Sequence, residues 1–151
     1  MARPRNRTRA LDVLFADTVF WFGLARNRDQ HRARAKAWDA WLETEGARIV
    51  TTEAVLWEWL NAAADVQTRQ AAVAGYRQLQ QELRLTIVPF TKERISKAVK
   101  LYEARHDKGW SLTDCLSFNV MQEMQLSCAL TTDRHFVQAG FRALLLEDPP
   151  E

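Results

Sequence analysis

WSLTDCLSFNVMQEMQLSCALTTDRHF, residues 110–136, contains a helical pattern, a short apolar strand and an aspartate at the edge of each. Residues 112–125 are predicted to form a helix, and the apolar run at 127–130 is typical of a buried strand. Asp114 lies in the first turn of the helix, and Asp133 follows the strand, 19 positions later. A helix that leads into a wholly apolar strand predicts a β-α unit of a parallel sheet.

The same alternation extends over the rest of the chain. The other predicted strands are 13–16, 47–52, 85–90 and 141–146. The other predicted helices are 18–24, 31–45, 53–64, 66–83 and 91–105, with a short helical turn that ends at Gly140. We therefore expect the α/β class: a single domain with a central, mostly parallel sheet of about five short strands and helices on both faces.

Length and composition fit one soluble globular domain, with 151 residues, 47% hydrophobic and 26% charged. No run of 18 apolar residues and no signal-peptide pattern is present, so we expect a cytoplasmic protein with no membrane partner. Cys115 and Cys128 fall inside apolar segments, outside any metal-binding spacing. We expect both to be small buried thiols.

Basic residues are concentrated at the start of the chain. Arg3, Arg5, Arg7 and Arg9 leave 17 basic against 19 acidic residues in the remainder. We expect residues 1–10 to form a flexible arm and residues 11–151 to form the folded domain. The arm could lie on nucleic-acid phosphates, or it could be a disordered solubilising tail.

Acidic residues occur at or near the carboxyl ends of the predicted strands, where open α/β sheets bind their ligands. Asp17 and Asp133 directly follow strands, while Glu53 and Glu58 lie in the helix after the second strand. Each acid has a structural explanation by itself. Asp17 and Asp133 can be N-caps, the spacing of Asp114 from Ser111 is that of a capping box, and Glu58 can lie on the flank of its helix.

Taken together, the acids favour a metal site. Two carboxylates about 4 Å apart repel each other by about 4 kcal/mol at an effective dielectric constant near 20, so a group of four needs a compensating cation. Oxygen-rich surroundings suit Mg²⁺ or Mn²⁺, and histidine or cysteine ligands, which zinc prefers, are missing from these strand-end positions.

With these residues in view, the sequence resembles the PIN-domain ribonucleases of the VapC-type toxins found in prokaryotic toxin–antitoxin pairs. The segments that carry the likeness occur in the family's order: FADTVFWFGL, DQHRAR, VTTEAVLWEWLN, WSLTDCLSFNVMQEMQL and ALTTDRHFVQAGF. The resemblance implies that Asp17, Glu58, Asp114 and Asp133 are the catalytic, metal-binding quartet, with Glu58 rather than Glu53 as the second acid. It also places Thr18 and Thr131 beside the metal or the substrate phosphate. His31 and His135 match recurrent positions, and we expect packing or helix capping from both.

The implied function is that of an Mg²⁺-dependent (or Mn²⁺-dependent) endoribonuclease, a hydrolase in which metal-activated water attacks RNA phosphodiester bonds. Single-stranded or looped RNA is the expected substrate. Arg26 and Arg28, with Arg32, Arg34 and Lys108, could form a basic rim for its phosphates or simply a solvated face. The resemblance further implies a homodimer and a cognate antitoxin that lies across the acidic cleft. Trp38, Trp41, Trp57 and Trp59 could supply core or partner surface.

Two other classes compete with this interpretation. A haloacid-dehalogenase-like phosphatase needs a second acid two residues after the first, and that position is Val19. A non-catalytic PIN-like module that binds RNA or protein is expected to have lost one of the four acids, yet all four are present. The chain has no GxSxG turn and no GxxxxGK or GxGxxG loop, which disfavours a serine hydrolase or a nucleotide-driven enzyme. The target RNA, the number of ions and the identity of the antitoxin are left open.

Overall fold

A computed structural model describes residues 9–151 of the chain. Most of the predicted basic arm, including Arg3, Arg5 and Arg7, lies outside the described residues. The described part begins with a short 3-10 helix, η1 (Arg9–Leu11), which leads directly into the first strand.

All five strands of the central sheet are parallel, as predicted, and their order is β3-β2-β1-β4-β5. The strands are β1 (Val13–Ala16), β2 (Arg48–Thr52), β3 (Leu85–Val88), β4 (Cys128–Leu130) and β5 (Arg142–Ala143). Phe15 at the centre of the sheet pairs with Val50 of β2 and Ala129 of β4. Leu14, Phe15 and Ala16 are fully buried, which explains why β1 has no alternation of polar and apolar residues.

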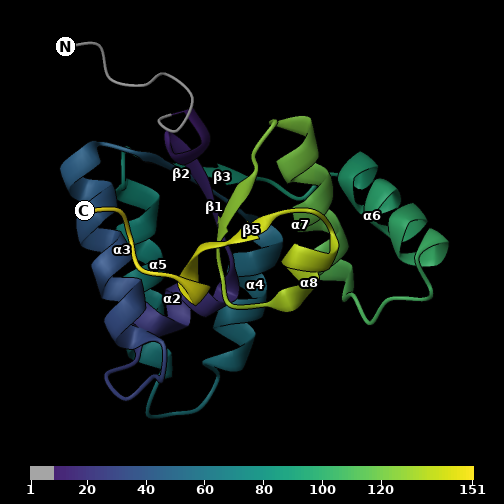
Figure 1. The fold of residues 1–151 in the computed structure, drawn as a ribbon. Coiled ribbons are helices and arrows are strands. Elements are labelled where there is room, and N and C mark those ends of the chain that lie inside the picture. The colour runs from purple at the N-terminus through teal and green to yellow at the C-terminus, as the bar shows by residue number, and fades with distance from the viewer. Residues whose placement is uncertain (1–8) are drawn as a thin grey trace, which may run out of the picture.

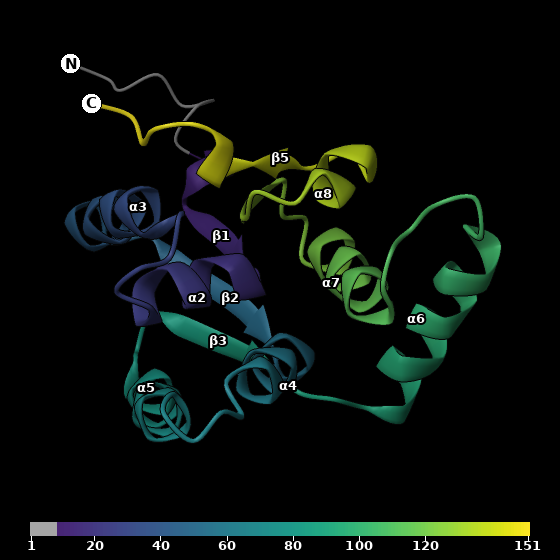
Figure 2. The same cartoon turned by 90° about the horizontal axis from the view of Figure 1, so that it is seen from below.

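Helices cover both faces of the sheet, which confirms the predicted α/β architecture. They are α2 (Thr18–Ala25), α3 (Arg32–Glu45), α4 (Glu53–Ala62), α5 (Arg69–Gln81), α6 (Lys92–Ala104), α7 (Leu112–Glu123), α8 (Arg134–Gln138) and the 3-10 helix η2 (Leu144–Leu146). The chain moves from β1 to β2 and β3 in one direction and then crosses over to β4 and β5. Because such crossovers are right-handed, the change of direction moves the later helices to the other face. In Figure 1, α3 and α5 lie on one side of the strands and α6 and α7 on the other; Figure 2 shows the same separation from below.

The end of the chain differs from the prediction. The apolar run at 141–146 was expected to be one strand, but only Arg142 and Ala143 pair with β4, and η2 follows. Leu144 and Leu145 are both buried, which consecutive residues of a strand that faces solvent on one side cannot be. Burial of both leucines therefore favours the turn over a longer strand.

The predicted apolar positions divide between core and surface. Cys115 and Cys128 are buried free thiols, as expected. Trp38 and Trp59 are buried, Trp41 is partly buried, and Trp57 is 67% exposed, so the four indoles do not form one common surface. Within residues 9–151, no helix has the length and apolar character needed to cross a bilayer.

Candidate metal centre

The four predicted acids come from four separate elements near the carboxyl ends of β1 and β4. Asp17 directly follows β1 at the N-cap position of α2, and Asp133 is the N-cap of α8 after β4. Asp114 lies in the first turn of α7, and Glu58 lies in α4. The backbone N–H of Asp17 donates to the carbonyl of Leu130, at 3.4 Å, and so ties the two strand ends together. The chain reverses its direction of crossover between β1 and β4, and such a switch point is where open α/β sheets bind ligands.

Thr131 connects two of the acids from below the surface. Its hydroxyl donates to Asp17 Oδ2 at 2.9 Å and accepts from the backbone N–H of Asp133 at 3.0 Å. Thr131 is fully buried, and Asp17 is only 7% exposed. The Thr131 hydroxyl therefore links Asp17 to Asp133, and its predicted role beside the metal or the substrate phosphate stays a prediction.

Asp114 is held by the capping box that its spacing from Ser111 predicted. The Ser111 hydroxyl accepts from the backbone N–H of Asp114, and Asp114 Oδ2 accepts from the backbone N–H of Ser111, both at 3.0 Å. These bonds fix the carboxylate at the start of α7. The Asp114 side chain therefore caps α7 and also belongs to the acidic cluster.

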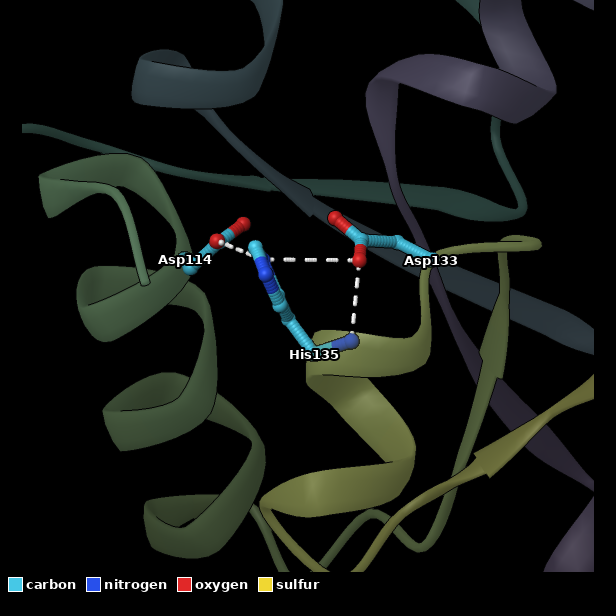
Figure 3. Close-up of side chains that lie close together, drawn as sticks. All are labelled: Asp114, Asp133 and His135. Atoms are coloured by element: carbon cyan, nitrogen blue, oxygen red, sulfur yellow. Dashed lines mark hydrogen bonds and ion pairs between the residues drawn. The ribbon is translucent and has the colours of Figure 1, made fainter. Parts of the chain in front are cut away.

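His135 places its ring between two of the acids, which the sequence-based expectation of packing or capping did not include. Its Nδ1 lies 3.0 Å from Asp114 Oδ2 and 3.5 Å from Asp133 Oδ1, as Figure 3 shows. The backbone N–H of His135 also donates to Asp133 Oδ1, at 2.9 Å. The sequence contained a signal for this position of His135. The residue lies two positions after Asp133, so it falls in the first helical turn next to that N-cap. By contrast, His31 is the N-cap residue of α3 and makes no side-chain capping bond.

Electrostatics join the four acids into one cluster. The pKa of Asp17 is raised from 3.8 to about 7, above all by burial. Hydrogen bonds from the Thr18 backbone and the Thr131 side chain lower this pKa, and the charges of Asp114 and Glu58 raise it. The pKa of Glu58 is raised by desolvation, although its side chain borders solvent, and then by Asp114 and Asp133. Within residues 9–151, none of these four acids forms an ion pair with a lysine or arginine.

The donor set fits a divalent cation. Ligand atoms of Asp114, Asp133 and His135 all lie within 4.8 Å of one another. Asp17 and Glu58 interact with this group electrostatically without belonging to that closest set. The buried hydroxyl of Thr18, next to Asp17, has no hydrogen-bond partner among the described residues. Oxygen donors in excess, with an uncompensated negative charge, are what hard cations require.

Family comparison agrees with this geometry. A family model of the PIN domain matches residues 14–142. The chain belongs to the PIN domain family. No curated protein sequence matches it.

Solved structures resemble this PIN domain, and VapC20 among them confirms the predicted likeness to VapC-type toxins. VapC20 of Mycobacterium tuberculosis, a toxin that cleaves the sarcin-ricin loop, has a TM-score of 0.74 and 25% identity, over 85% of this chain and 95% of its own. FitAcB of Neisseria gonorrhoeae has a TM-score of 0.61 and 18% identity, and the match covers 86% of this chain and 95% of FitAcB. FitAB bound to an IR36 DNA fragment has a TM-score of 0.64 and 18% identity, over 91% and 99%; these last two show the fold alone.

Arg26, one of the predicted substrate-binding residues of this PIN domain, lies at the opposite end of α2 from Asp17. Arg26 follows the last residue of α2, whereas Asp17 precedes the first, and eight helical residues span roughly 12 Å. Arg26 lies over the ring of Phe22, with 3.9 Å from its guanidinium carbon to the ring centroid, and both Arg26 and Arg28 are exposed. Other members of the predicted rim have structural partners, because Arg32 donates to the carbonyl of Leu24 and Arg34 pairs with Asp148.

Proposed function

We propose that this PIN domain is a metal-dependent endoribonuclease that hydrolyses RNA phosphodiester bonds with Mg²⁺ (or Mn²⁺). The observation that carries the proposal is the gathering of acids at the carboxyl ends of β1 and β4: Thr131 links Asp17 to Asp133, and donor atoms of Asp114 and Asp133 lie within 4.8 Å of each other. The charges of Asp114 and Asp133 also act on Glu58. The structural likeness to VapC20, an RNA-cleaving toxin by its description, supports RNA as the substrate class.

In this proposal the four carboxylates hold the ion, and they are the catalytic and metal-binding residues. A bound divalent ion supplies Lewis-acid chemistry, which lowers the pKa of a coordinated water and neutralises charge on the phosphoryl oxygens. Thr131 and Ser111 orient Asp17 and Asp114 beforehand, because each carboxylate already accepts a hydrogen bond. The buried, unpartnered hydroxyl of Thr18 follows Asp17 in the sequence, and its predicted place beside the metal or the substrate phosphate is part of this proposal.

RNA enters this proposal as a single strand or an exposed loop. A splayed backbone can reach a cluster at the sheet edge more easily than one inside a duplex. Arg26 and Arg28 are exposed at the far end of α2, so they would contact phosphates some distance from the bond that is cut.

The toxin role is the finer part of the proposal. We infer that the chain is the toxin of a type II toxin–antitoxin system and that a cognate antitoxin lies across the acidic cleft, in line with the likeness to VapC20. The genetic test is the neighbouring reading frame. A small gene for a DNA-binding antitoxin supports the toxin role, and its absence favours a stand-alone nuclease.

A homodimer is also part of the proposal, and an apolar groove offers a surface for it. The groove, of about 300 Å³, runs between α4, α6 and α7 beside Glu58; its exposed apolar residues are Trp57, Phe90, Ile95 and Leu112. Exposed apolar surface of this kind is commonly used for partners. Sedimentation equilibrium of the wild type and of Ile95→Asp tests it: we expect a dimer that the charged variant dissociates, and a monomeric wild type would contradict the homodimer.

The decisive experiment for the nuclease is cleavage of labelled single-stranded RNA with Mg²⁺, Mn²⁺ or EDTA. We expect cleavage with either ion, none with EDTA, and a loss of at least about 100-fold in Asp114→Asn. The matched control is Asp12→Asn, which makes the same change at an exposed position before β1. RNA that is bound but not cut with either ion would replace the nuclease by a non-catalytic binding module.

A further inference from the structure

We propose that Nδ1 of His135 is a direct ligand of the metal ion, and that the centre therefore prefers Mn²⁺, or another first-row transition ion, to Mg²⁺. The inference rests on the proposed metal centre and concerns which ion it takes. A histidine ligand changes the donor set from oxygen alone to mixed oxygen and nitrogen.

The first argument is the spacing of the donor atoms. An octahedral ion with bonds of about 2.1 Å places adjacent ligand atoms about 3.0 Å apart. Nδ1 of His135 lies 3.0 Å from Asp114 Oδ2 and 3.5 Å from Asp133 Oδ1. Nδ1 thus has nearly the separation from each carboxylate oxygen that adjacent ligands of one ion have, and the three donor atoms lie within 4.8 Å of one another. Figure 3 shows the ring between the two acids. Without a metal, Nδ1 and Asp114 Oδ2 must share a proton to lie this close. A bound ion would replace that proton.

The second argument is that the ring is held where it is. Asp133 Oδ1 accepts from the backbone N–H of His135, which fixes the first turn of α8 against one of the acids. A Cβ atom built on Gly109 would lie 3.9 Å from Nε2, so the loop before α7 passes close to the imidazole. The side chain is nevertheless 34% exposed, which leaves a path for an ion from solvent.

The third argument is the chemistry of the donors. Imidazole suits first-row transition ions, whereas Mg²⁺ is usually bound by oxygen atoms and waters. Within residues 9–151 no lysine or arginine pairs with Asp114 or Asp133, so His135 is the only basic side chain in ion-pair contact with them there. A ring in this position either blocks a Mg²⁺ site or completes a mixed-donor site, and the ligand spacing favours the second.

The test is electron paramagnetic resonance of Mn²⁺ bound to the purified, chelator-treated full chain, with no RNA present. We expect hyperfine coupling to a directly bound imidazole nitrogen in the wild type. The coupling should disappear in His135→Ala and in His135→Gln, which keep the backbone N–H that donates to the Asp133 cap of α8. Circular dichroism verifies that both variants fold, and His106→Ala, at an exposed loop histidine, is the matched control and should keep the signal.

Titration of the free ion gives an independent readout. Both His135 variants should weaken Mn²⁺ binding by at least about tenfold, since even residues behind a ligand contribute that much, and should change Mg²⁺ binding much less. Bound Mn²⁺ without nitrogen coupling in the wild type, or coupling that persists in His135→Ala, would overturn the inference and leave the nuclease proposal intact. A wild-type chain that binds neither ion would overturn the metal centre and this inference with it.

Discussion

Asp17 is the residue at which burial and charge oppose each other most strongly. Its side chain is almost inaccessible, and its pKa rises to about 7 from an ordinary 3.8. Between these values the folded protein keeps a proton that the unfolded chain releases. The free energy of unfolding therefore falls as pH rises through this window, and the loss is complete above about pH 7.

Asp17→Asn should accordingly stabilise the metal-free protein. At about pH 8 in EDTA we expect a higher Tm, with a gain in the free energy of unfolding of up to roughly 4 kcal/mol, because the buried charge is gone. The gain should shrink as the pH falls towards about 3, below the ordinary pKa of 3.8, where Asp17 is protonated in both states. Thermal scans across this range provide the measurement, and Asp12→Asn is the matched control for the same change at an exposed position. A variant less stable than the wild type at about pH 8 would contradict the assigned cause.

Thr131 is the residue that keeps Asp17 and Asp133 in register. Thr131→Val should lower the free energy of unfolding by about 1 to 3 kcal/mol, because it leaves the buried N–H of Asp133 without its acceptor. It should also weaken Mg²⁺ binding, since Asp17 loses its hydrogen bond. Urea unfolding and ion titration measure the two effects. Thr131→Ser retains the hydroxyl and should recover most of the stability and most of the Mg²⁺ affinity. Equal losses in Thr131→Ser and Thr131→Val would show that the hydroxyl is not what holds the acids.

At the scale of elements, the acids of the cluster also begin helices. Asp114 completes the capping box of α7, and Asp133 caps α8 by accepting from the backbone of His135. The prediction that these residues cap helices is confirmed, and the same two residues also belong to the acidic cluster. A helix N-terminus presents free N–H groups that hold a carboxylate in one orientation, which is also what an ion requires of its ligands.

Ser111→Ala tests this double role. Loss of the cap should cost about 1 kcal/mol of stability, and loss of a fixed Asp114 should in addition weaken Mg²⁺ binding. Thr91→Ala is the matched control, because Thr91 caps α6 in the same way and its helix carries none of the four acids. Chemical unfolding should show similar costs for the two variants, and only Ser111→Ala should alter ion binding. If Ser111→Ala and Thr91→Ala bound Mg²⁺ with equal affinity, the cap of α7 would have no part in ion binding.

The whole molecule assembles the site through strand order. β1 lies between β2 and β4, so that the acids after β1 and β4 become neighbours although more than a hundred residues separate them. An ion that binds this assembled pocket, and not the unfolded chain, must stabilise the entire fold.

Saturating Mg²⁺ or Mn²⁺ should therefore raise the Tm of the wild type. The gain is about 2.7 kcal/mol at an ion concentration of 100 times Kd. Asp114→Asn should lose most of this gain while remaining folded, as differential scanning calorimetry with and without EDTA would show. A wild-type Tm that does not respond to either ion would count against the centre.

The sequence by itself determined the elements and the acids. Apolar runs predicted β1 to β4, the spacing of Ser111 and Asp114 predicted a capping box, and the positions of the acids after the strands indicated where carboxylates could meet. These features are local, because they depend on neighbours within a few residues.

Only the tertiary structure decided the strand order, the length of β5 and the position of the His135 ring. Burial of Leu144 and Leu145 turned a predicted strand into η2, and the packing of α8 beside α7 brought His135 to Asp114, 21 residues away. Each of these depends on contacts between distant segments, whose energies a local pattern does not contain.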